Sequence, residues 1–146
     1  MKNNYLSLFV FIIVGFTSCS KEYTGDSFDT STSLAPYVEI ATKTAQTVKQ
    51  GASFSVSVQM RTALTENVTV NYTVTGTSAT IQGSIVIPRN TLKATSIVTI
   101  PTGVVVAPAT SVVAQFKIVS AIRGSESLRI GYKDPTKEVI TITITP

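Results

Sequence analysis

The sequence predicts an all-β fold: a seven-stranded antiparallel β-sandwich that follows a cleaved leader. Three observations predict this class. The 146 residues include 23 threonines, and Val and Ile dominate the apolar 43%, all of them residues that favour strands. Long runs of good helix formers are absent after residue 18. Short segments of alternating apolar and polar side chains recur at intervals of about 8 to 15 residues between turn residues, the pattern of a sandwich.

Residues 1–18 have the composition of an export signal. Lys2 supplies a positive charge, residues 5–16 (YLSLFVFIIVGF) form an apolar run, and the small residues Thr17 and Ser18 precede Cys19, the only cysteine. This pattern resembles a bacterial lipoprotein signal, although its last apolar residue is Phe rather than the usual Leu. The resemblance implies cleavage before Cys19 and lipidation of its sulfur.

Two other interpretations of this leader remain, an ordinary cleaved signal and an uncleaved anchor. The anchor is tested by length, because twelve residues make about 18 Å of helix against a hydrocarbon core of about 30 Å. The run is therefore too short to span a bilayer.

Residues 19–34 contain Cys19 and a segment rich in Ser, Thr, Asp and Gly, without an apolar period, which indicates a flexible tether. Fifteen such residues span roughly 20 to 23 Å. Ser20 follows the cysteine where an aspartate would resemble an inner-membrane retention signal. We therefore expect an outer-membrane lipoprotein of the cell envelope. The acidic residues of the tether are compatible with display of the protein on the cell surface, and the sequence does not decide which membrane face it occupies.

Residues 35–146 form the predicted sandwich. In residues 53–60, alternate positions from Phe54 to Met60 are apolar and the others are polar, so one face is apolar. Residues 67–75 repeat the pattern and place Tyr72 on the apolar face, where we expect a core side chain. The other strands are predicted at residues 37–43, 84–87, 92–100, 111–121 and 138–145.

Two connections have recognisable turn chemistry. Residues 88–91 (PRNT) predict a four-residue hairpin between the strands on either side. Residues 101–110 contain two prolines and a glycine, and we expect them to cross between the sheets.

A family resemblance covers residues 37–145. Gly51 precedes a Ser/Val strand, residues 68–74 (VTVNYTV) lead into Gly76 and Thr77, and a further strand covers residues 96–101. This order resembles the Calx-beta and immunoglobulin-like sandwich modules of bacterial surface lipoproteins. Calcium-binding members of that family cluster acidic residues in loops, because the cation takes six to eight oxygen ligands. The loops of this chain lack such a cluster, so no metal site is predicted.

The composition argues against several functions. The net charge of +4 becomes +3 without Lys2, from 11 basic minus 8 acidic residues, and the basic residues are scattered, so nucleic acid is not an expected partner. The absence of histidine excludes His-based triads and His metal sites. The acids of the domain show no spacing typical of a glycosidase pair. We expect neither an enzyme nor a cofactor.

The best candidate for a ligand contact is Tyr132. It lies in the turn-rich residues 129–135, and we expect it to be exposed beside Arg129, Lys133 and Asp134, which could hydrogen-bond a ligand. The alternative is an ordinary loop tyrosine folded over the edge of the sandwich.

These observations lead to two functional hypotheses. In the first, the lipid-anchored sandwich is a non-catalytic recognition module for a glycan or a protein. In the second, it is a structural subunit of an outer-membrane complex, assembled through strand edges without a small ligand. The sequence does not specify an oligomeric state.

Overall fold

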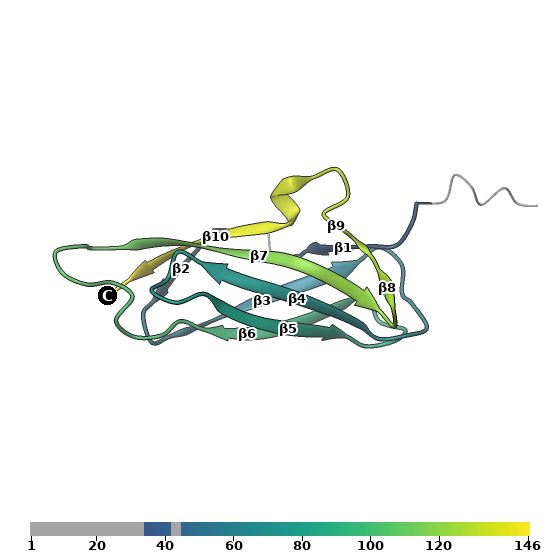
Figure 1. Ribbon diagram of the computed structural model, residues 1–146, viewed down its shortest axis with the longest axis horizontal. Helices are drawn as coiled ribbons and strands as arrows, with labels where there is room; N and C mark the ends of the chain where they lie inside the picture. The colour runs from purple at the N-terminus through teal and green to yellow at the C-terminus, as the bar shows by residue number, and fades with distance from the viewer. Residues whose placement is uncertain (1–33, 42–44) are drawn as a thin grey trace, which may run out of the picture. The chain divides into compact units, whose positions relative to one another are not determined.

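The computed structural model describes residues 34–41 and 45–146. The predicted leader, Cys19 and nearly all of the tether lie outside the described residues. Within them, ten strands form two packed sheets, and a 3-10 helix, η3 (Pro135–Lys137), precedes the last strand (Figure 1). The all-β sandwich expected from the sequence is confirmed.

The two sheets are named A and B. Sheet A has the order β6 (Lys93–Thr99), β3 (Ser53–Met60), β1 (Tyr37–Ile40) and β9 (Arg129–Ile130). Sheet B has the order β2 (Gln46–Lys49), β10 (Val139–Thr145), β7 (Val112–Arg123), β4 (Val68–Thr75) and β5 (Ile81–Ile87), and β8 (Glu126–Ser127) pairs with β7. All pairings are antiparallel except two short parallel ones, β1 with β9 and β2 with β10.

All seven predicted strands are present, and three short ones, β2, β8 and β9, were not predicted. The first predicted strand, residues 37–43, is shorter in the structure, where β1 ends at Ile40 in sheet A. The chain then continues as β2 in sheet B. An alternating pattern of apolar and polar side chains indicates that one face of a strand is buried. Both sheets of a sandwich bury one face, so the pattern does not show where the chain changes from one sheet to the other.

The hairpin predicted at residues 88–91 is wrong, because β5 belongs to sheet B and β6 to sheet A. The turn is held by the connection between β3 and β4: the Arg89 amide donates to Asn67 Oδ1 at 2.9 Å, and the Asn90 amide donates to the Leu64 carbonyl at 2.7 Å. These bonds anchor the turn to a second sheet-crossing segment rather than to a hairpin partner. The crossover expected at residues 101–110 is confirmed, since it joins β6 to β7.

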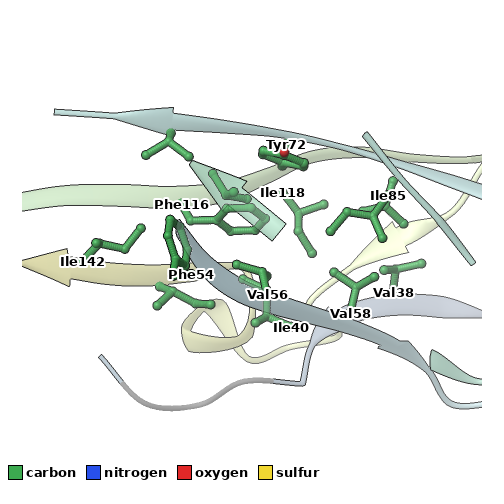
Figure 2. Packing of buried hydrophobic residues seen from close by; sticks show 14 of the residues in the cluster. Val38, Ile40, Phe54, Val56, Val58, Tyr72, Ile85, Phe116, Ile118 and Ile142 are labelled. Carbon is green, nitrogen blue, oxygen red and sulfur yellow. The ribbon is translucent and has the colours of Figure 1, made fainter. Parts of the chain in front are cut away.

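The core lies between the two sheets (Figure 2). Tyr72 is buried, as predicted, and its ring stacks on Phe116 with 4.7 Å between centroids. Its hydroxyl end extends over Gly83, its register partner in β5, where an added Cβ would lie 2.3 Å from Tyr72 Oη. Fully burying a side chain such as Phe116 or Val56 contributes about 1.5–3 kcal/mol, so this shared apolar interior is the main source of stability.

Strand β7 contains an irregularity that shapes the outer face of sheet B. Ser120 pairs with Asn71, but Ile118 pairs with Tyr72, so Val119 is an extra residue without a partner in β4. The Asn71 side chain donates from Nδ2 to Ser120 Oγ at 2.9 Å. This bulge turns Val119 outward, where its side chain is exposed.

Candidate functional site

The structure places three of the four candidates from the sequence near Tyr37 of β1: Arg129, Tyr132 and Lys133. Arg129, in β9, pairs with Tyr37 in the parallel β1–β9 register. The Tyr132 ring stacks on Tyr37 with 5.2 Å between centroids, and Lys133 Nζ lies 5.4 Å from the centre of the Tyr132 ring. Tyr132 is half-buried rather than exposed, because Tyr37 covers part of it.

The fourth candidate, Asp134, forms the N-cap of η3. Its Oδ1 accepts hydrogen bonds from the Thr136 amide at 3.0 Å and from Thr136 Oγ1 at 2.5 Å. A side-chain oxygen that caps a helix satisfies amides that have no partner within the helix. The carboxylate of Asp134 thus has a structural role in shaping the segment that carries Tyr132.

The same segment is fastened to β1 by an ion pair in which the carboxylate, Glu39, is buried and the cation, Lys137, is partly exposed. Glu39 is the one charged side chain classed as buried among residues 34–41 and 45–146. Its Oε1 accepts from Gln59 Nε2 at 2.6 Å, and its Oε2 lies 2.8 Å from Lys137 Nζ. Hydrogen bonding to Glu39 and attraction to its charge raise the pKa of Lys137, and these effects outweigh its partial desolvation.

These contacts bear on acid and base chemistry. Glu39 is neutralised by Lys137, Glu126 is paired with Arg123, and Asp134 caps η3. A general acid or base needs a proton position that substrate can reach, at a suitable pKa. Each of these three carboxylates already has a structural partner.

A hollow of about 420 Å³ lies on the outer face of sheet B. Polar side chains from two neighbouring strands line it in register: Asn71 is opposite Ser84, and Thr73 is opposite Gln82. Val119, raised by the bulge, also contributes to its lining. We call this the sheet hollow.

The sheet hollow offers amide and hydroxyl groups and no charge. Gln82 and Ser84 are exposed and lie in β5, at the free edge of sheet B. The Asn71 amide is held by its bond to Ser120, so one donor of this site is fixed before any ligand arrives. Such a surface suits a neutral polar ligand that can exchange hydrogen bonds with it.

Sequence reasoning missed the sheet hollow. The alternation predicted for residues 67–75 places Asn71 on the outward face, but outward polar residues are ordinary on a strand with one buried face. The hollow depends on the pairing of β4 with β5 and on the bulge at Val119. Neither feature can be recognised from the local alternation of apolar and polar residues.

Two further findings concern metals and membranes. The part of the chain that the structure describes contains no group of three or more His, Cys, Asp or Glu side chains that could hold a metal ion. It also contains no helix that is both long and apolar enough to cross a bilayer.

No protein-family model and no curated protein matches the sequence. Solved structures do match in fold. The apo form of the Calx CBD1 domain is 13% identical with a TM-score of 0.55, and the match covers 77% of this chain and 97% of that one. CBD12 from CALX1.2 is 13% identical with a TM-score of 0.54, over 75% of this chain and 43% of that one. The calcium binding domain CBD12 of CALX1.1 is 14% identical with a TM-score of 0.53, over 73% and 44%.

The fold is a Calx-beta-like, immunoglobulin-like β-sandwich. At 13–14% identity this likeness concerns the fold alone. The match also spans less than half of the CBD12 chains. Functional residues must therefore be argued from this chain's own surface.

Proposed function

We propose that this protein is a lipid-anchored component of the cell envelope whose β-sandwich is a non-catalytic recognition module for a glycan or a protein. The observation that carries the proposal is the sheet hollow, a concave surface with amide and hydroxyl side chains in its lining, at an open sheet edge. Its uncharged amides and hydroxyls match the hydroxyl groups of a sugar better than they match an ionic ligand.

The anchoring part of the proposal rests on the sequence around Cys19. A lipoprotein carries more than one acyl chain on its N-terminal cysteine, and each buried methylene contributes about 0.8 kcal/mol to membrane binding. Two or more chains make such attachment stable. The tether then holds the recognition surface near the bilayer, in an outer-membrane location.

The non-catalytic part rests on side chains that are already engaged. The chain has no histidine, and Glu39, Glu126 and Asp134 have structural partners. Calcium binding, for which the similar CBD12 domain of CALX1.1 is named, is not proposed for this chain. Calcium requires several clustered oxygen ligands, and the described residues offer no acidic group of three.

A glycan array probed with the full chain in detergent tests the recognition proposal. We expect binding to a neutral glycan and its loss when Gln82 and Ser84 are both changed to alanine. Gln115→Ala is the matched control, because Gln115 is an exposed glutamine of β7 that does not line the hollow. Titration calorimetry with the best glycan then quantifies each variant.

Two outcomes would change the proposal. Loss of binding in a Tyr132→Ala, Lys133→Ala variant, with Gln82→Ala unaffected, would move the site to the tyrosines on β1. Failure of the intact chain to bind any glycan or envelope protein would remove the recognition function.

A second candidate function is supported by the strand edges. The chain would then be a structural subunit that joins other subunits by strand addition, without a small ligand. The specific observation is that β5 and β6 are long edge strands almost without charge.

A further inference from the structure

The edges of the two sheets differ in how well they are protected. The edge strands of one side are short: β9 has two residues with Arg129, β2 has four with Lys49, and β8 has two with Glu126. On the other side, β5 (IQGSIVI) and β6 (KATSIVT) have seven residues each and contain no acid and no proline. Natural edge strands are normally blunted by charge, proline, bulges or short length. The β5 and β6 edges have only Lys93.

The free backbone groups of β6 can be assigned from its pairing with β3. The Ile100 amide donates to the Ala52 carbonyl at 3.0 Å, and the Met60 amide donates to the Leu92 carbonyl at 2.8 Å. The N–H and C=O groups of successive residues point to opposite sides of a strand, so those of the even-numbered residues of β6 point toward β3. The N–H and C=O groups of its four odd-numbered residues therefore point away from the sheet, at Lys93, Thr95, Ile97 and Thr99.

The outer side chains of this edge are also without cover. Ile97 is 70% exposed, near the middle of β6. Elsewhere on this face the hydroxyls of β3 and β6 bond to each other, Ser53 to Thr99 at 2.8 Å and Ser57 to Thr95 at 2.7 Å. These bonds hold β6 in a regular, extended shape that a further strand can match.

We propose that the β6 edge pairs with the β6 edge of a second copy of this chain, in antiparallel register centred on Ser96. The pairing satisfies the outward groups of both strands, since Thr95 faces Ile97 of the second copy and Lys93 faces Thr99. An identical, self-complementary edge closes a two-fold dimer. This inference rests on the second candidate function, the structural one.

Two copies of the β6 edge can pair without bringing like charges together, and only the antiparallel direction allows this. In the antiparallel register the two Lys93 side chains are six residues apart, about 20 Å along the strands, beyond the screening length of about 8 Å at physiological salt. A parallel pairing would place like charges side by side. The β5 edge lies beside β6 (Figure 1) and has no charge, so it adds no repulsion.

Cysteine cross-linking of the full chain in membranes tests the register. Two Ile97→Cys side chains would be diagonal neighbours, about 7–8 Å apart, within reach of a short bismaleimide. Lys93→Cys is the matched control on the same strand and face, because its two copies would be too far apart. The parent chain, which contains Cys19 alone, gives the background.

We expect a band of twice the chain mass for Ile97→Cys and none for Lys93→Cys. Equal cross-linking of both, no cross-linking of Ile97→Cys, or a product with a different protein would each overturn the proposal. In detergent, light scattering should give a dimer for the parent and a monomer for Ile97→Lys, with an unchanged circular dichroism spectrum. Glycan binding by Ile97→Lys reports separately on the sheet hollow, so failure of one proposal is distinguishable from failure of the other.

Discussion

Replacing Gly83 with alanine tests how the core closes at the β5 edge. The new Cβ would lie 2.3 Å from Tyr72 Oη and 2.5 Å from Tyr72 Cζ, whereas unbonded carbon atoms prefer about 3.5–4.0 Å. The Tyr72 ring has little room to retreat, because it stacks on Phe116, which is fully buried. Gly83 does not have a positive φ, so the expected cost comes from this clash and not from backbone strain. Overpacking of this kind costs about 1–3 kcal/mol.

The assay is thermal unfolding of the full chain, followed by circular dichroism. For a sandwich of this size, each kcal/mol lowers Tm by roughly 4 °C, so Gly83→Ala should lower it by roughly 4–12 °C. Ser84→Ala, at the next position on the outer face, should have little effect. A Tyr72→Val background should remove most of the additional cost, because contacting residues are not additive. A Gly83→Ala protein as stable as the parent, or equally destabilised without the Tyr72 ring, would refute the reasoning.

Three other substitutions test separate parts of the structure. Lys137→Met should lower Tm at neutral pH, because Glu39 then stays buried without its cation. Since the hydrogen bond to Glu39 raises the pKa of Lys137 from its ordinary 10.5, the parent should keep this advantage below pH 10.5 and lose it as pH rises through the folded pKa. A pH-independent difference in Tm between the two proteins would contradict this. Phe116→Ala should reduce the free energy of unfolding by about 3–5 kcal/mol in urea titration, and a loss below 1 kcal/mol would be incompatible with its burial. Asn71→Ala should cost about 0.5–1.5 kcal/mol in the same titration through its lost bond to Ser120, and no change would show that this bond does not stabilise the bulge.

The sequence was sufficient to predict the class of fold and several side chains of the core. Period-2 alternation assigns faces directly, so Phe54 and Tyr72 were placed inward before any partner strand was known. Alternation does not say which strands pair. A tight turn such as residues 88–91 is compatible with a hairpin or with a crossing between sheets, and here bonds to Leu64 and Asn67 select the crossing.

The candidate site was less predictable for a similar reason. Arg129, Tyr132 and Lys133 are close in sequence, and the structure keeps them near Tyr37. The stacking of Tyr132 on Tyr37 could not be foreseen, because it depends on the unpredicted parallel pair of β1 and β9. Residues of the sheet hollow are distant in sequence and meet only through strand register.

The attachment of this sandwich to a membrane is the claim on which its proposed role depends most. Metabolic labelling of growing cells with radioactive palmitate, read on the immunoprecipitated chain, tests it directly. We predict a labelled parent chain and an unlabelled Cys19→Ala variant. An unlabelled parent chain would contradict the account.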